Sequence, residues 1–311
     1  MQHNLSSWGD QQALPPPPKP FTLVLHNCLG SWDVFLSLFG SFTQLTHLPS
    51  IVALQDPPVY RGKLPSFNLF TVVSPPTTAA CKPWVAFYVY SSFLATVSLL
   101  PRFFGRGDVM ALDLFSPDGF FNPSTTVLTI INSYRTKGCS NNTRSVPPDI
   151  IFPSSPLPTL TLGDLNIHHP TADPLRTFKE DEIATSSSYF DRATDLGFSL
   201  LNTPGVFTRF SMSLIWRPGV LDLAFACRLL APYFTEWSDP LPSTGSDHIP
   251  ILLRFEAPLF RAPPRTPNWA LPDWASLESS LKCTTILPPP SLPTTRSLEI
   301  WFSTNLGRVT S

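Results

Sequence analysis

Short apolar segments rich in β-branched and aromatic residues recur along the chain, and they restrict the folds that the chain can adopt. Each is bounded by Gly, Pro, Ser or Asn, a pattern typical of β-strands separated by turns. Several are apolar on both faces, so helices or a second sheet must cover them on each side. The eight segments are residues 21–27, 50–56, 85–91, 109–115, 126–134, 159–166, 219–226 and 248–255. We therefore expect a large sheet protein with packed layers.

Two further segments carry apolar residues at helical spacing. Residues 31–42 open with Ser31 as a helix N-cap, and their apolar positions are Trp32, Phe35, Leu36 and Phe39. The helix in residues 186–202 is expected to stop at Gly197, and its apolar positions are Tyr189, Phe190, Ala193 and Leu196. We expect both helices to pack these faces against the core.

Residues 84–100 contain no charged side chain, and their seventeen positions just suffice for a membrane-spanning helix. Their serines, their threonine and the flanking prolines fit two adjoining buried strands better. We expect the strands, and no membrane partner.

The charge balance and the cysteines exclude several classes of protein. Lys and Arg number 21 and Asp and Glu 22, so a nucleic-acid partner must be bound by a local patch. The cysteines are widely spaced and form no Cys-x-x-Cys motif, which favours neither a zinc site nor a disulfide framework. A reducing compartment suits this pattern, and the first residues lack the features of a secretory signal. We expect an intracellular protein.

Polar groups follow the apolar runs at several of the expected strand ends. Asn27, Asp56 and Tyr134 each close one run, and Asp164 with Asn166 closes another. Asp247 and His248 come just before the last run. In layered α/β folds such strand ends and their loops form the edge at which ligands bind. These groups are candidates for one shared cleft, although most strands also end where polar turns begin.

Three motifs in this order carry a family resemblance: "GDLN" at 163–166, "LDLAFA" at 221–226 and "SDH" at 246–248. Together they resemble the endonuclease/exonuclease/phosphatase superfamily with its DNase I-like fold. More narrowly, phrases such as "ALQDPPVYRGKLPSF" resemble the endonuclease domain of fungal non-LTR (LINE-type) retrotransposons. The resemblance implies an α/β fold, a four-layer α/β/β/α sandwich.

The resemblance also implies a domain organisation. The endonuclease/exonuclease/phosphatase domain would span residues 20–258, after a disordered Pro-rich segment at 1–19. Residues 259–311 would be a Pro-rich linker and the start of a segment leading to a reverse transcriptase, which does not follow in this chain. The implied partners are DNA and, in a full-length element, a reverse transcriptase domain. The active protein would be nuclear.

The resemblance assigns a role to each candidate site residue. Asp56 and Asp247 would hold Mg²⁺, with Mn²⁺ as an alternative, because this ion prefers hard oxygen ligands. Asp164 would activate the attacking water and Asn166, two residues on along an extended segment, would hold the phosphate. An Asx-type turn is the alternative for that pair.

The remaining assigned roles concern charge and hydrogen bonds at the phosphate. His248 would stabilise the oxyanion while Asp222 fixes its tautomer. Ser246 would orient its neighbours or cap a turn. Tyr134 and Asn27 would donate hydrogen bonds to the phosphate or order the carboxylates, unless they are ordinary buried polar groups.

Other basic side chains flank the expected cleft. Arg135, Arg209 and Arg217 are candidates for contacts with DNA phosphates, and solvated loop arginines are the alternative. His168 is a further candidate. Since adjacent residues of an extended segment point to opposite faces, His168 and His169 are not expected to share a zinc ion.

The resulting expectation is a Mg²⁺-dependent phosphodiester hydrolase that nicks DNA and leaves a 3′-hydroxyl primer for retrotransposition. The alternatives are another phosphoesterase of the same fold, namely a repair endonuclease or a small-phosphoester phosphatase, and an inactive transposon remnant. Asp56 stands where the superfamily generally has Glu. A carboxylate that is one methylene shorter is expected to hold Mg²⁺ more weakly or through water.

Overall fold

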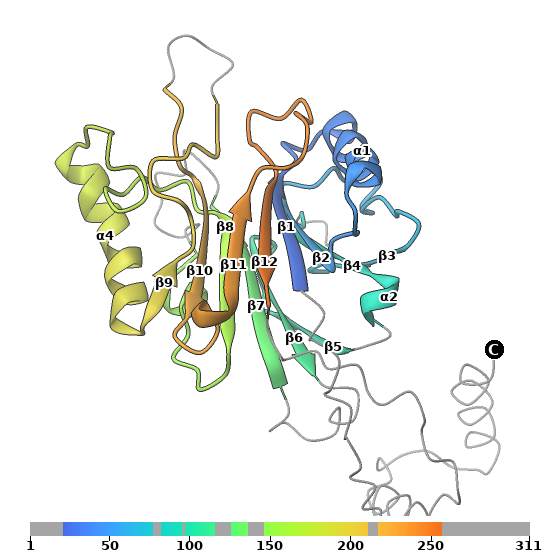
Figure 1. Cartoon of the computed structure of the whole chain (residues 1–311), viewed down its shortest axis with the longest axis horizontal. Coiled ribbons are helices and arrows are strands. Elements are labelled where there is room, and N and C mark those ends of the chain that lie inside the picture. The colour runs from blue at the N-terminus through green and yellow to red at the C-terminus, as the bar shows by residue number, and fades with distance from the viewer. Residues whose placement is uncertain are drawn as a thin grey trace, which may run out of the picture. The chain divides into compact units, whose positions relative to one another are not determined.

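The computed structural model describes residues 21–76, 82–94, 97–115, 126–135, 146–210 and 217–256, all within the compact unit Met1–Pro263. They form two six-stranded sheets (Figure 1). In spatial order, the first sheet contains β11 (Phe234–Ser238), β12 (Ile251–Phe255), β1 (Phe21–Asn27), β2 (Ile51–Gln55), β4 (Val85–Tyr90) and β3 (Phe70–Val73). The second contains β5 (Ser98–Phe103), β6 (Val109–Phe115), β7 (Thr126–Tyr134), β8 (Thr159–Asp164), β10 (Asp222–Cys227) and β9 (Phe198–Leu200).

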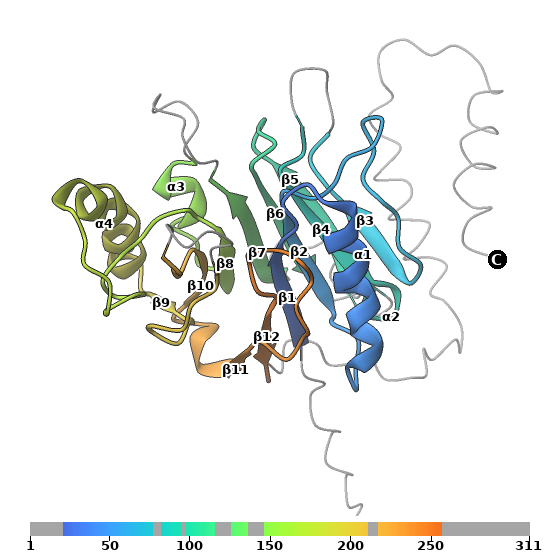
Figure 2. The ribbon, with the colours of Figure 1, turned by 90° about the horizontal axis from the view of Figure 1, so that it is seen from above.

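Helices cover the outer faces of both sheets, so the molecule has four layers (Figure 2). Helix α1 (Trp32–Ser41) lies on the first sheet, and α4 (Glu180–Asp195) lies on the second. The described residues also contain two short helices, α2 (Ser91–Leu94) and α3 (Pro148–Ile151), and the 3-10 turns Phe42–Gln44 and Ala231–Tyr233. The expected four-layer α/β/β/α sandwich is confirmed.

The alternation of side chains along the central strands explains why their sequences are apolar on both faces. In β1, Leu23 and Leu25 join the core between the sheets, whereas Val24 packs in the cluster under α1. That outer cluster is strongly aromatic: for example, the centroids of the Phe39 and Tyr88 rings are 5.1 Å apart. Burial of both faces supplies the apolar area that stabilises the central strands.

Strand direction brings the functional groups to one edge. Each sheet has one parallel pair at its centre, β1 with β2 and β7 with β8, and these pairs end at residues 27, 55, 134 and 164. Strands β10 and β12 run antiparallel to β8 and β1, so they start where those strands end. The register pairs Asp164 with both Tyr134 and Asp222. Side chains before β10 and β12 therefore meet side chains after β1 and β8.

All eight predicted strands are present, together with four others, β3, β5, β9 and β11, of which only β5 was expected, as the second strand within residues 84–100. Each of the four lies at the edge of a sheet and is partly exposed, so it carries no continuous apolar run. Residues 84–100 contribute to β4 and β5, as expected, but β5 is half-exposed where a buried strand was predicted. None of the described helices is long and apolar enough to span a membrane.

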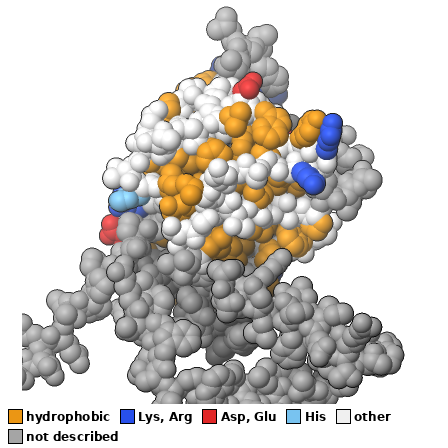
Figure 3. Space-filling view, turned by 90° about the vertical axis from the view of Figure 1, so that its right-hand side faces the viewer, with side chains coloured by type: hydrophobic (Ala, Val, Ile, Leu, Met, Phe, Trp, Pro, Cys, Tyr) orange, Lys and Arg blue, Asp and Glu red, His pale blue; other side chains and the backbone are white. Residues whose placement is uncertain are grey.

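Helix α1 has its predicted start but not its full predicted face. The Ser31 hydroxyl accepts a hydrogen bond from the Val34 amide at 3.3 Å, which confirms the N-cap. Phe35 and Phe39 are buried as expected. The prediction is wrong for Trp32 and Leu36, which are 42% and 54% exposed because Val34 and Leu38 complete the buried face instead. Apolar side chains are accordingly visible on this side of the molecule, with few charges among them (Figure 3).

Helix α4 begins at Glu180, six residues before the predicted segment. Its first turns are acidic and polar, so apolar periodicity detects only the second half of the helix. Acidic side chains suit a helix N-terminus because they interact favourably with the helix dipole. Gly197 follows the helix with φ of +70°, in agreement with the predicted stop.

Several predictions fall outside the described residues. These are the disordered segment at 1–19, the linker at 259–311, and Cys81, Cys139 and Cys283. The other two cysteines, Cys28 and Cys227, are buried and free.

Candidate active site

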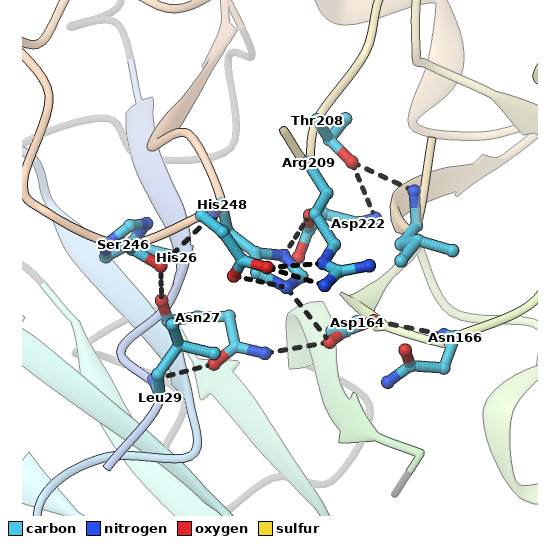
Figure 4. A network of polar contacts seen from close by, with 12 residues as sticks. His26, Asn27, Leu29, Asp164, Asn166, Thr208, Arg209, Asp222, Ser246 and His248 are labelled. Carbon is cyan, nitrogen blue, oxygen red and sulfur yellow. Dashed lines mark hydrogen bonds and ion pairs between the residues drawn. The ribbon is translucent and has the colours of Figure 1, made fainter. Parts of the chain in front are cut away.

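The strand ends of the two sheets are joined by a hydrogen bond between residues 137 positions apart. Asn27, at the end of β1, donates from Nδ2 to Asp164 Oδ2 at 2.8 Å (Figure 4). Asp164 closes β8 and is 1% exposed. A buried carboxylate is costly unless it is hydrogen-bonded. Asn27 therefore stabilises the charged form of Asp164 and ties the sheets together at the site.

His248 lies between three carboxylates. Its Nδ1 is 2.7 Å from Asp222 Oδ2, and its Nε2 faces Asp164 Oδ2 at 3.8 Å and Asp247 Oδ1 at 3.6 Å. Burial by itself lowers the pKa of His248, but the charge and hydrogen bond of Asp222, with Asp164 and Asp247, raise that pKa to about 9. The imidazole is therefore protonated near neutral pH, with Nε2–H directed at the Asp164 side of the site.

Two residues not singled out from the sequence fix the backbone of Asp222. The Thr208 hydroxyl accepts hydrogen bonds from the amides of Leu221 and Asp222 at 2.9 and 3.0 Å. Asn202 donates to the Asp222 carbonyl at 2.8 Å and accepts from the Ala224 amide at 2.9 Å. Thr and Asn in a connecting segment carry no sequence signal for this task, because their partners are identified only by the fold.

Ser246 connects the loop before β12 to the end of β1. Its hydroxyl donates to the Asn27 carbonyl at 2.9 Å and accepts from the His248 amide at 3.1 Å. Beside it, Thr244 Oγ1 lies 3.0 Å from Nε2 of the buried His26. Burial, followed by the charge of His248, lowers the pKa of His26 to about 3, so His26 is neutral. Sequence analysis did not select His26, because it lies inside an apolar strand.

Asp164 also accepts a hydrogen bond from the Asn166 amide, Oδ1 to N, at 3.1 Å. This i, i+2 contact is an Asx turn, and Asn166 has φ of +47°. The expectation of an extended segment through Asn166 is therefore wrong, because β8 ends at Asp164. The Asn166 side chain donates to the Arg135 carbonyl at 2.6 Å. The turn does not remove Asp164 from the site, since Oδ2 still faces Asn27 and His248.

The pKa values of Asp164 and Tyr134 both rise at this edge. Burial, followed by the charge of Asp222, raises the pKa of Asp164 above its usual range, although His248 and Asn27 oppose the shift. Burial and the charges of Asp164 and Asp56 raise the pKa of Tyr134, while a hydrogen bond with Asn27 opposes this. Tyr134 is therefore a neutral phenol that can donate a hydrogen bond.

Asp56 lies beyond β2 with φ of +41° and is paired with a lysine. The Nζ atom of Lys82 is 2.5 Å from Asp56 Oδ1 and 4.4 Å from the centroid of the Trp84 ring. Trp84 in turn stacks on Tyr134, with ring centroids 5.7 Å apart. Sequence analysis missed Lys82 and Trp84, because each reaches the site only through the pairing of β2 with β4.

The basic candidates for DNA contact differ in their surroundings. Arg135 donates from Nη1 to the Asn166 carbonyl at 3.2 Å, and Arg209 binds Asp247 Oδ2 through Nε and Nη2, each at 2.7 Å. Arg217 is exposed. A Cβ atom placed on Gly219 would lie 2.9 Å from His168 Cε1, so the His168 ring packs closely on that backbone. The ring of its neighbour His169 stacks instead on Phe190 of α4.

The donor set at this edge suits a hard divalent cation. Buried oxygens of Asp222, Asp247 and Asn166 (Oδ1 in each) accept no hydrogen bond from the described residues. Carboxylate and amide oxygens are the ligands that Mg²⁺ prefers. Within the described residues, Asp164, Asp222 and His248 can offer three ligand atoms within 4.8 Å of one another. Neither Asp56 nor Asp247 is part of that group, although both were expected to hold the metal.

Structures of other proteins with this arrangement of sheets are known. The endonuclease domain of TRAS1, a telomere-specific non-LTR retrotransposon, is similar with a TM-score of 0.54 and 14% identity, over 76% of this chain and 99% of that one. The AP endonuclease LMAP from Leishmania major gives 0.57 and 17%, over 77% and 88%. The 3′-5′ exonuclease NExo from Neisseria meningitidis gives 0.54 and 13%, over 76% and 99%.

These neighbours are DNase I-like endonuclease/exonuclease/phosphatase domains, and this chain has the same fold. In sequence, no protein-family model matches the chain. No curated protein matches it either.

Proposed function

We propose that this chain is a divalent-metal-dependent phosphodiester hydrolase that nicks DNA. The observation that carries the proposal is the buried Asp164 carboxylate, which lies between the Asn27 amide and the His248 imidazole. Phosphodiester hydrolysis needs a base, a hydrogen-bond donor and a positive charge close to one point, and these three residues can supply them. The fold shared with an endonuclease domain and an exonuclease supports the same reaction class.

Asp164 is the proposed base. Its raised pKa brings it closer to neutral pH, where a carboxylate can be ionised and still accept a proton effectively from water. The Asn27 side-chain amide donates a hydrogen bond to Oδ2 of Asp164, and the Asn166 backbone amide donates one to Oδ1. The attacking water would therefore meet a carboxylate that cannot rotate away.

His248 is the proposed stabiliser of developing negative charge. As an imidazolium it would donate from Nε2 to a phosphoryl oxygen, while Asp222 holds Nδ1–H and so fixes the ring. The phenol of Tyr134 and the amides of Asn27 and Asn166 would donate hydrogen bonds to the same phosphate. Burial strengthens all of these interactions because the local dielectric constant is low.

The proposed cofactor is Mg²⁺, with Mn²⁺ as an alternative. Asp56 and Asp247 would hold it, and the unpartnered oxygens of Asn166 and Asp222 are further ligand candidates. When bound, the ion would neutralise charge on the phosphoryl oxygens and help the 3′ oxygen to depart. Because Asp56 replaces the usual Glu, we expect weak binding that needs millimolar metal.

The proposed biological role is to supply a primer. A nick with a 3′-hydroxyl would start reverse transcription by a reverse transcriptase domain of a full-length element, in the nucleus. Support comes from the motifs that resemble LINE-type endonucleases and from the similar fold of a retrotransposon endonuclease domain.

A phosphatase that acts on small or terminal phosphoesters is the second candidate. NExo is described in one structure as a 3′-5′ exonuclease and in another, bound to a product DNA hairpin, as a 3′ phosphatase. One hydrolytic core can thus serve more than one phosphoester, with the surrounding loops selecting the substrate.

Supercoiled plasmid incubated with Mg²⁺ tests the proposal. Asp164→Ala should abolish nicking, whereas Asp195→Ala on the exposed surface of α4 should leave it intact. Nicks that a DNA polymerase extends without prior phosphatase treatment would carry the expected 3′-hydroxyl. Phosphate release from small esters without nicking would favour the phosphatase, and salt-sensitive DNA retention without hydrolysis would indicate an inactive remnant.

A further inference from the structure

Lys82 is the one lysine of the described residues that contacts a carboxylate of the candidate site. Its ammonium lies 2.5 Å from Asp56 Oδ1, and the Trp84 ring lies on another side at 4.4 Å. A cation over the face of an indole is attracted by the ring quadrupole. Lys82 is therefore held from two directions next to a carboxylate that the family resemblance assigns to a metal ion.

The backbone places this pair in register. The Asp56 amide donates to the Trp84 carbonyl at 2.8 Å, and the Asp56 carbonyl accepts from the Gly30 amide at 2.7 Å. Lys82 comes two residues before Trp84, so the segment that leads into β4 brings its side chain to the end of β2. The position of Lys82 beside Asp56 therefore follows from the pairing of these strands.

Internal cations already offset part of the negative charge at this edge. The carboxylates are Asp56, Asp164, Asp222 and Asp247. Lys82 pairs with Asp56, and Arg209 pairs with Asp247. An acidic cluster attracts a divalent ion in proportion to its uncompensated charge. Each internal cation therefore lowers the affinity of the cluster for metal.

Lys82 is bound to its carboxylate less firmly than Arg209 is bound to Asp247. The Arg209 backbone forms bridges with Gly219 and His248, and its side chain binds Asp247 through two nitrogens. Lys82 offers a single ammonium on a long flexible stem, and its side chain is 34% exposed, against 22% for Arg209. Lys82 can therefore leave its carboxylate at lower cost than Arg209 can.

We propose that Lys82 is a resident cation that competes with the divalent metal ion for Asp56 and so sets the metal affinity of the site. This inference rests on the proposed function, in which Asp56 is a metal ligand. In the absence of metal, Lys82 neutralises Asp56 and keeps it in place. Metal binding requires Lys82 to leave Oδ1, because two cations on one carboxylate oxygen repel each other.

Direct titration with Mn²⁺ tests the competition without relying on catalysis. Free Mn²⁺, followed by electron paramagnetic resonance, would be measured against the wild-type chain, Lys82→Gln, Lys82→Arg and Lys179→Gln. Lys179 is exposed at the start of α4, so Lys179→Gln removes the same charge away from the site. Thermal melts without metal would show that all four proteins are folded.

Lys82→Gln should bind Mn²⁺ about tenfold more tightly, the size expected for losing one partly solvated charge beside the ligand. Lys82→Arg, which keeps the charge, and Lys179→Gln should both bind as the wild type does. Unchanged or weaker binding by Lys82→Gln would overturn the inference, as would the absence of binding in all four proteins. Failure of the proposed function is a separate result: Mn²⁺ binds with the expected order of affinities, but no plasmid is nicked.

Discussion

The two halves of the candidate site are built in different ways. In the half formed by β8, β10 and the loop before β12, Asp164, Asp222 and His248 are 1–4% exposed, and side chains such as Thr208 and Ser246 hold their backbone. In the half formed by β2 and β4, Asp56 and Lys82 have side chains that are 16% and 34% exposed and form an ion pair with each other. The first half has a fixed geometry, and the second can exchange its cation.

Burial accounts for this difference in energetic terms. Removing one partner of a buried charged pair leaves an uncompensated charge and costs about 3–5 kcal/mol, whereas exposed pairs contribute about 0–1 kcal/mol. A group that must keep one position throughout the reaction belongs in the buried half. A group that must release one cation and accept another belongs in the more open half.

The largest expected effect is a loss of nicking rate that differs between variants of the two halves. Asp222→Asn should lower the nicking rate by about 10³-fold at saturating metal, because the amide cannot hold the His248 imidazolium in place. Asp56→Asn should instead raise the metal concentration needed for half-maximal rate. Nicking rates across a Mg²⁺ titration would distinguish the two variants. A loss in Asp56→Asn that no concentration of metal restores would contradict the division.

An intermediate effect concerns stability. Thr208→Val should lower the free energy of unfolding by about 2 kcal/mol, because two buried amides, those of Leu221 and Asp222, lose their acceptor. Thr71→Val on the exposed face of β3 is the matched control and should change it by about 0.5 kcal/mol or less. Urea denaturation would measure both. Equal values would show that Thr208 does not hold the buried half.

The smallest expected effect is a shift in titration. In the wild type the His248 ring should titrate with a pKa of about 9, since the carboxylates around it outweigh the effect of burial. Asp222→Asn should lower this pKa, because it removes the main group that raises it. An NMR titration of the histidine rings would follow the change. The nicking rate should fall as pH rises through the pKa of His248, so the variant should lose activity at lower pH than the wild type.

The fold could be predicted from the sequence to a large extent because apolar periodicity reports burial. The segments that form β1, β6 and β8 are fully or almost fully buried, as their continuous apolar runs predict. Strands β3 and β11 could not be predicted, because an edge strand that is partly exposed to water has no such pattern. Likewise, the rotation of α1 that exposes Trp32 depends on the sheet beneath it.

The candidate site divides along similar lines. Asp164, Asp222 and His248 could be selected because they lie in motifs of a known order, and Asp164 and His248 also stand at the ends of expected strands. Lys82, Thr208, Asn202 and His26 could not, because nothing in the neighbouring residues distinguishes them from ordinary polar positions. Asn166 shows a further limit: the sequence left a phosphate-binding role and an Asx turn open for it, and the structure shows the turn, whereas the role stays a prediction.

From the order of its residues alone, this chain specifies which segments are buried and which polar groups stand where those segments end. Steric preferences and the pattern of apolar residues depend on neighbours in the sequence, so both can be predicted from the sequence. The pairing of Lys82 with Asp56, and of Asn27 with an aspartate 137 residues away, arises only when the sheets come together. Charge and hydrogen bonding act through space, and therefore the cation that occupies each carboxylate is settled by the packed fold.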